Sequence, residues 1–147
     1  MTNSKENLLI STFTLGDLQL AVEALMVQEI IRVPSRTVVY LSSPEIWGVI
    51  NLRGKIVTVW DLGPTLGLKS QEITEDSRII VIKFDDESVG LLVDGINDVM
   101  EIKTSEIHPT PGNVDERQAR YFQGIFGESE RLISVLDLNL LEKHMKG

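Results

Sequence analysis

The first part of the chain shows the two-residue alternation of apolar and polar side chains that is typical of a strand with one buried face. Apolar residues occupy every second position from Leu18 to Val22. The apolar run Leu8–Phe13 predicts a strand before it, and Leu15-Gly16-Asp17 predicts the turn between them. After these strands, Ala24–Val27 predicts one helical turn and Glu29–Val33 an extended segment.

The densest strand signal lies in the segment Gly48–Leu62, which has the sequence GVINLRGKIVTVWDL. It predicts two strands joined by a tight turn at Arg53-Gly54, because glycine supplies the positive φ that such a hairpin needs.

The rest of the chain predicts two more strand pairs and a final helix. Asp137 is placed to cap that helix through its side chain. These remaining elements are the strands Arg78–Phe84, Ser88–Val93, Tyr121–Phe126 and Leu132–Leu136, the helix Leu138–Met145, a helical turn at Gly95–Met100, a turn or helix at Ser42–Trp47 and an irregular connection at Thr104–Glu116.

The second half of the sequence repeats the first. Gly48–Leu62 aligns without a gap on Gly124–Leu138, and Leu8–Phe13 aligns on Ile79–Phe84. Two β-rich segments can be aligned by chance on apolar residues alone, but here glycine and acidic positions match as well. We therefore expect approximate repeats over residues 8–62 and 79–138, with the exchange of strands between them left open.

The length of 147 residues predicts one domain with a sizeable core. The chain has 14 valines and 15 isoleucines but only a few alanines, which favours a mainly β fold. Each repeat has four or five short strands, and closing them into a small barrel covers their edges. Because so small a barrel has little core of its own, we expect two barrels packed as one unit, with a groove at their seam.

Composition then excludes several classes of function. Lys and Arg total 14 against 22 Asp and Glu, and the net charge of −8 disfavours nucleic acid and anionic lipid as partners. The absence of cysteine excludes disulfides and thiolate metal sites. No apolar run is long enough to span a membrane, so we expect a cytoplasmic protein without membrane insertion.

Catalytic and cofactor signatures are also absent. The sequence holds no phosphate-binding loop, dinucleotide fingerprint, nucleophile elbow or zinc-protease motif. The segment Asp94–Asp98 lacks the spacing of a calcium loop. For His108 and His144 we favour a solvated or locally bonded side chain over catalysis. We expect no enzyme activity, no metal and no cofactor, although a carboxylate pair assembled in space stays open.

The segment Gly48–Leu62 closely resembles the CheW family of chemotaxis coupling proteins, whose pattern there is G-V-x-N-L-R-G, a β-branched strand and an Asp-Leu pair. The resemblance extends to Val27–Ile30, Gly90–Gly95 and the Asp137-Leu138 helix start. Trp60 departs from the family, which more often has a smaller apolar residue there.

The resemblance implies a mainly β fold of two five-stranded SH3-like barrels with short helices, including a C-terminal one. It implies a non-catalytic adaptor, monomeric when free and recruited to membrane receptor arrays. Its partners would be the regulatory domain of a CheA-type histidine kinase and the cytoplasmic tips of transmembrane chemoreceptors. The alternatives are an adaptor of the same fold in a pathway for surface motility, or a small β-barrel enzyme or ligand-binding protein.

The candidate partner-binding residues centre on the Arg53-Gly54 turn. Arg53 either contacts the receptor or pairs within the molecule with an acid such as Glu29 or Asp94, and both roles are compatible. For Asn51 and Gly54 we favour a turn-shaping role. The full candidate set is Val27, Glu29, Gly48, Asn51, Arg53, Gly54, Val93 and Asp94.

Within that set, Gly48 is expected to allow close backbone approach. Val27 is either a core residue or an exposed apolar anchor. Glu29 is the better surface candidate, because an unpaired buried carboxylate is costly. Val93 and Asp94 are their equivalents in the second half of the chain.

Overall fold

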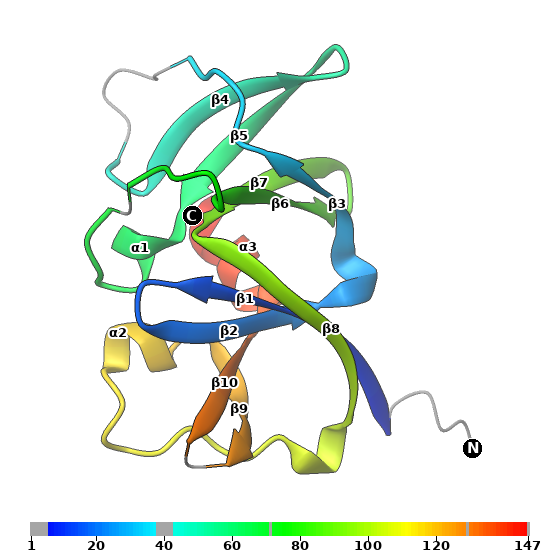
Figure 1. The fold of residues 1–147 in the computed structure, drawn as a ribbon, viewed down its shortest axis with the longest axis vertical. Helices are drawn as coiled ribbons and strands as arrows, with labels where there is room; N and C mark the ends of the chain where they lie inside the picture. Colours follow the sequence, from blue (N-terminus) through cyan, green and yellow to red (C-terminus); the bar gives the residue numbers. More distant parts are fainter. Residues whose placement is uncertain (1–5, 38–42, 71, 129, 147) are drawn as a thin grey trace.

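A computed structural model describes residues 6–37, 43–70, 72–128 and 130–146 of the chain. Over these residues the strands form two five-stranded sheets, as the sequence predicts, with a few short helices (Figure 1). The strands of the first sheet are β1 (Asn7–Leu15), β2 (Leu18–Glu23), β8 (Gly95–Lys103), β9 (Phe122–Glu128) and β10 (Arg131–Leu136). Those of the second sheet are β3 (Val27–Arg32), β4 (Ile46–Leu52), β5 (Lys55–Asp61), β6 (Arg78–Phe84) and β7 (Glu87–Val93).

Short helices connect the strands and end the chain. The predicted C-terminal helix is confirmed as α3 (Leu138–Lys146), and its cap is Asp137, whose Oδ1 accepts hydrogen bonds from the backbone N–H of Asn139 and Leu140. The other helices are the 3₁₀ turns η1 (Ala24–Met26) and η2 (Thr104–Glu106) and the single-turn helices α1 (Leu62–Thr65) and α2 (Glu116–Ala119).

Each sheet takes strands from both sequence repeats. The first sheet has the order β8-β1-β2-β10-β9, and the second has the order β3-β6-β7-β5-β4. The hairpin β1–β2 of the first repeat is therefore held between β8 and β10 of the second repeat, and the hairpin β6–β7 lies between β3 and β5 of the first. The two joins β2–β10 and β5–β7 are parallel, whereas the other pairings are antiparallel.

A large apolar core lies between the two sheets. Phe13 and Leu20 of the first sheet, Ile80 and Leu91 of the second, and Leu141 of α3 are fully buried in one cluster. Each sheet also has a smaller apolar cluster of its own, around Val59 and Val81 in the second sheet and around Ile10 and Val135 in the first. Burial of apolar side chains is the main favourable contribution to folding, so the contact between the sheets stabilises both of them.

Two glycines at equivalent repeat positions permit a close crossing of the backbone. At β4, Thr37 and Val49 exchange two backbone hydrogen bonds of 2.9 Å beside Gly48. At β9, His108 and Ile125 exchange two of 2.8 Å beside Gly124. A Cβ atom would lie 2.8 Å from the carbonyl oxygen of Thr37 if added to Gly48, and 2.5 Å from that of His108 if added to Gly124. Gly48 therefore has the close-approach role expected from the sequence.

The structure corrects two local expectations. Gly95–Met100 is not a helical turn but the start of β8, where Gly95 pairs with Thr14 and Ile96 with Phe13. The open edge of β1 supplies hydrogen-bond partners that the local sequence cannot indicate. Ile46 and Trp47, expected in a turn or helix, begin β4, while residue 42 lies outside the described residues.

We expect Gly48→Ala and Gly124→Ala each to lower the free energy of unfolding by about 1–3 kcal/mol, because the added methyl group meets a backbone oxygen that cannot move aside freely. For a chain of this size the melting temperature falls by roughly 2–4 °C per kcal/mol. Denaturant and thermal unfolding measure both effects. Gly112→Ala is the control, because a Cβ there has open space, and an equal loss in all three variants would contradict the steric explanation.

Candidate partner-binding site

The β4–β5 hairpin ends in a two-residue turn formed by Arg53 and Gly54. Both residues have positive φ, 51° at Arg53 and 86° at Gly54, as in the mirror-image turns that match the twist of a hairpin. The Oδ1 atom of Asn51 accepts a hydrogen bond of 2.8 Å from the backbone N–H of Gly54. Asn51 and Gly54 thus shape the turn, and the turn presents the Arg53 side chain.

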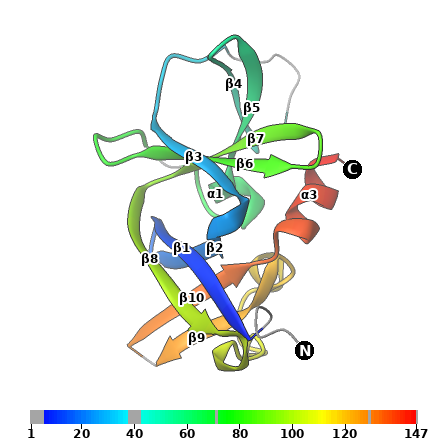
Figure 2. The same cartoon turned by 90° about the vertical axis from the view of Figure 1, so that its right-hand side faces the viewer.

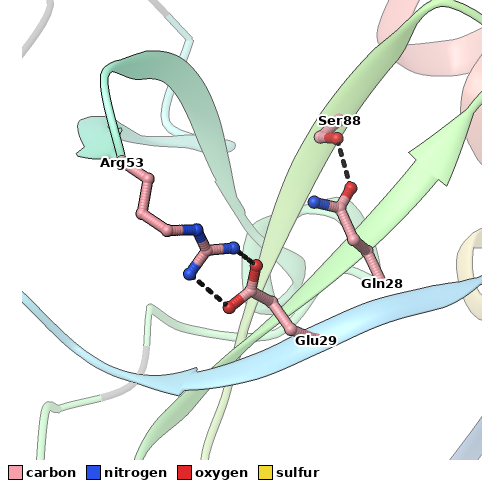
Figure 3. Close-up of polar contacts among 4 residues, drawn as sticks. All are labelled: Gln28, Glu29, Arg53 and Ser88. Atoms are coloured by element: carbon pink, nitrogen blue, oxygen red, sulfur yellow. Dashed lines mark hydrogen bonds and ion pairs between the residues drawn. The ribbon is translucent and has the colours of Figure 1, made fainter.

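The Arg53 guanidinium forms a two-pronged ion pair with Glu29 of β3 (Figure 3). Nη1 of Arg53 donates to Oε1 of Glu29 at 3.1 Å, and Nη2 donates to Oε2. The Arg53 side chain is 68% exposed and that of Glu29 is 23% exposed. Beside them, the Ser88 hydroxyl of β7 donates to Oε1 of Gln28 at 2.6 Å. The sequence left Glu29 and Asp94 open as ion-pair partners of Arg53, and in the structure the partner is Glu29.

This pair shifts the titration of both groups. The hydrogen bonds from Arg53 hold the pKa of Glu29 below its ordinary value, and the same bonds raise the pKa of Arg53. Both side chains therefore stay ionised throughout the neutral range. A bidentate arginine–carboxylate contact also fixes the orientation of the guanidinium plane.

The backbone of Arg53 is strained, and this strain is informative. Positive φ is costly for a residue with a Cβ atom, and asparagine or glycine would adopt it more readily. Such a conformation persists where the surrounding structure fixes it. Here the ion pair with Glu29 holds the Arg53 side chain in place.

A groove of about 790 Å³ adjoins the ion pair on the second sheet. Ile56 of β5 is 70% exposed, and Trp60 is partly buried at the same strand. Lys55, Lys83 and Arg53 bring positive charge to a molecule with a net charge of −8. Apolar surface surrounded by charge is typical of a site for another protein. The lining residues include Gln28, Leu52, Arg53, Lys55, Ile56, Trp60, Lys83, Asp86, Glu87, Met145 and Lys146.

A larger cavity, with a volume of about 1190 Å³, lies on the concave surface of the first sheet. Leu132 of β10 is 44% exposed there, and Met100, Phe126 and Ile133 contribute further apolar surface. Because the residues of this cavity and those of the groove belong to different sheets, the molecule has two separate surfaces with apolar character.

The other predicted site residues lie apart from the Arg53–Glu29 pair. Val27 is half-buried at the start of β3, packed against the core between the sheets. Val93 is 1% exposed in the same core. Asp94 joins the two sheets, because its Oδ2 accepts from the backbone N–H of Gly16 at 2.6 Å and its own N–H donates to Thr14 at 3.0 Å.

Sequence reasoning missed several contacts near the site. The Arg36 guanidinium lies 4.4 Å from the ring centre of Trp47 and donates to that residue's carbonyl oxygen at 2.6 Å. The exposed position of Ile56 could have been found, since it alternates with the buried Val57 and Val59 along β5. The link between Gln28 and Ser88 had no signal, because these residues lie 60 positions apart.

Other chemistry is not indicated by the geometry. Across the described ranges, no group of three His, Cys, Asp or Glu side chains is arranged to hold a metal ion. No helix among these residues is long and apolar enough to cross a membrane. The groove beside Arg53 is lined by charged and apolar side chains.

Comparison with known proteins agrees with this picture. The profile of the CheW-like domain matches residues 10–145. The chain belongs to this family. It is 41% identical over 96 residues to the chemotaxis protein CheW of Bacillus subtilis (strain 168), a match covering 65% of this chain and 62% of that protein, less than two thirds of its length. It is 30% identical to CheW of Rhizobium meliloti (strain 1021) over 144 residues, which cover 95% of this chain and 93% of that protein.

A solved CheW-like structure has the same fold. The crystal structure of the scaffolding protein TtCheW from Thermoanaerobacter tengcongensis superimposes with a TM-score of 0.80 at 30% sequence identity, covering 89% of this chain and 84% of that one. The family resemblance inferred from the Gly48–Leu62 segment is thereby confirmed.

In Arg53→Asn, we expect the pKa of Glu29 to rise toward its ordinary value, because the guanidinium that stabilises the carboxylate is gone. In the native chain the pair contributes stability above the ordinary pKa of Glu29, and this contribution is lost as the pH falls through the depressed value. Titration of the side-chain carbon by NMR measures the change. The melting temperature at neutral pH should change little, because Asn-Gly suits this turn. A Glu29 titration identical in both proteins would show that the pair does not form in solution.

Asp61 gives a second pH prediction. Burial raises its pKa, although the backbone N–H of Gly63 and the hydroxyl of Ser70 donate to the carboxylate. Ionisation of Asp61 therefore destabilises the folded chain as the pH rises above the ordinary value. Asp61→Asn keeps a helix-capping side chain, so we expect it to be more stable than the native chain at pH 7, with a difference that vanishes in acid. Denaturant unfolding at several pH values measures this, with Asp137→Asn at the equivalent cap as control.

Proposed function

We propose that the chain is a non-catalytic adaptor that couples chemoreceptors to a CheA-type histidine kinase in bacterial chemotaxis signalling. The match to the CheW-like domain over residues 10–145 carries this proposal. The likeness to a scaffolding protein over most of both chains supports it. An adaptor works by presenting surfaces, and the groove and the cavity described above supply two of them.

We assign the receptor to the groove beside the Arg53–Glu29 pair. The guanidinium is more exposed than its partner carboxylate and keeps N–H groups free to meet carboxylates or carbonyls of a second protein. The exposed Ile56 offers an apolar anchor next to it. A helical receptor tip with acidic and apolar side chains would complement this combination of charge and apolar surface.

We assign the kinase regulatory domain to the concave surface of the first sheet, around Leu132 and Phe126. This surface has the larger share of exposed apolar side chains suited to a stable protein contact. Because the two assigned surfaces are on different sheets, both partners can bind at once. Such an adaptor would act in the cytoplasm, at membrane receptor arrays.

Binding assays with a cognate receptor signalling fragment and a kinase fragment test the proposal. We expect Arg53→Asn to weaken receptor binding about tenfold, the effect of losing one charged hydrogen bond, while kinase binding is kept. Leu132→Glu should weaken kinase binding and keep receptor binding, because it places a charge in the apolar surface that we assign to the kinase.

Arg120→Asn serves as the matched control, because Arg120 is exposed and lines neither surface. Isothermal titration and reconstituted kinase activity are the measurements. Failure of the native chain to bind either partner at micromolar concentration would refute the adaptor function.

A further inference from the structure

Helix α3 connects the two sheets. It follows β10 of the first sheet, yet its C-terminal half lies beside the second sheet (Figure 2). Leu141 is buried in the core between the sheets, and Met145 lines the groove together with Trp60 of β5. The helix therefore reaches from β10 of the first sheet to β5 of the second sheet.

His144 makes two polar contacts at this end of the helix. Its Nε2 lies 2.6 Å from Oε1 of Glu45, and its Nδ1 lies 3.1 Å from the hydroxyl oxygen of Tyr121. The ring also meets the rings of Tyr121 and Trp60 edge to face, with centroid distances of 5.3 and 6.3 Å. The side chains of His144 and Glu45 are 33% and 23% exposed, so the contact is partly shielded from water.

The two contacts of His144 can each match a donor with an acceptor. A carboxylate accepts but does not donate, so the proton of the neutral ring is assigned to Nε2, which donates to Glu45. Nδ1 is then free to accept from the Tyr121 hydroxyl. One imidazole ring thus connects a residue before β9 with a residue before β4, and the two partners lie 23 and 99 positions away from it.

Glu45 holds the base of the β4–β5 hairpin. It directly precedes β4, and its carbonyl oxygen accepts a hydrogen bond of 2.7 Å from the backbone N–H of Asp61 at the end of β5. Strand β4 is at the edge of the second sheet. Within the described residues, β5 pairs with β7 over Thr58–Asp61, which leaves the Arg53 end of β5 without a hydrogen-bonded strand on that side.

Arg53 lies at the far end of this hairpin. The seven residues of β4 span about 23 Å at 3.3 Å per residue, so a small tilt at the base moves the tip by a larger distance. The hairpin is tied at the tip by the Arg53–Glu29 pair, along β4 by the two backbone hydrogen bonds between Thr37 and Val49, and at the base by the Glu45–His144 contact. The base contact links the hairpin to α3, as does the contact of Trp60 with the His144 ring.

We propose that His144 is a positioning residue for the Arg53 site: through Glu45 it sets the tilt of the β4–β5 hairpin relative to α3 and the first sheet. The importance of this tilt for receptor binding rests on the proposed function. The positioning itself can be measured without any partner.

The experiment compares His144→Phe, which keeps an aromatic ring but loses both hydrogen bonds, with His144→Gln, whose amide can still donate to Glu45. We expect backbone amides of β4–β5 to exchange about tenfold faster in His144→Phe, while amides of β1–β2 keep their native rates. The pKa of Glu29 should also rise toward its ordinary value, because the displaced Arg53 stabilises its carboxylate less. His144→Gln should restore both readouts. Hydrogen exchange and NMR titration measure them.

Glu45→Ala removes the same contact without changing the helix and replaces His144→Phe if that variant does not fold. Lys143→Ala, at an exposed position of α3, is the matched control. Faster exchange in every strand alike, an unchanged hairpin in Glu45→Ala, or an equal effect of Lys143→Ala would overturn the proposal. If the native chain fails to bind the receptor fragment, the proposed function fails, but the exchange result still decides the role of His144.

Discussion

The fold depends on the exchange of two hairpins between the sequence repeats. In each sheet the exchanged hairpin pairs on both sides with strands of the other repeat. One repeat alone would leave the backbone N–H and C=O groups of those strand edges without partners, which is costly where they are shielded from water. The exchange also places residues of both repeats in the apolar core between the sheets, where the fully buried Phe13 and Leu91 belong to one cluster. Small barrels with little interior of their own become stable by sharing that core.

This shared core matters for an adaptor. Two partners that must be held in a defined geometry need binding surfaces on one rigid body, and relative motion of two loosely linked domains would lose that geometry. Here the sheets are joined by strands, by the core and by α3. The polar contacts of Arg53 and of His144 then act locally. They orient the β4–β5 hairpin relative to sheets whose arrangement the core already fixes.

Much of the fold could be predicted from the sequence because the signals are local. The Arg53-Gly54 turn and the Asp137 cap depend on neighbouring residues, and each lies where the pattern places it. The alternation over Leu18–Val22 correctly marks the strand β2, but the single buried face it predicted is wrong, because Ala21 on the other face is also fully buried. The helical turn expected at Gly95–Met100 is wrong because β8 is specified by its pairing with β1, about 80 residues earlier. For the same reason the sequence could not decide between Glu29 and Asp94 as the ion-pair partner of Arg53. The register of β3, which lies beside the hairpin, places Glu29 there. The contact of His144 with Glu45, across 99 positions, left no trace in the local pattern.

The strand order also sets the sequence of events during synthesis. The second sheet has all five strands once Val93 has left the ribosome, whereas the first sheet also needs β10, which ends at Leu136. The β1–β2 hairpin is made before the other described hairpins, yet its neighbours β8 and β10 both follow the last strand of the second sheet. While it waits, its two unpaired edges and apolar face are available to another nascent copy, which could supply β8 and β10 in place of the chain's own. An interlocked fold thus contains an early hairpin whose pairing depends on strands that are made much later.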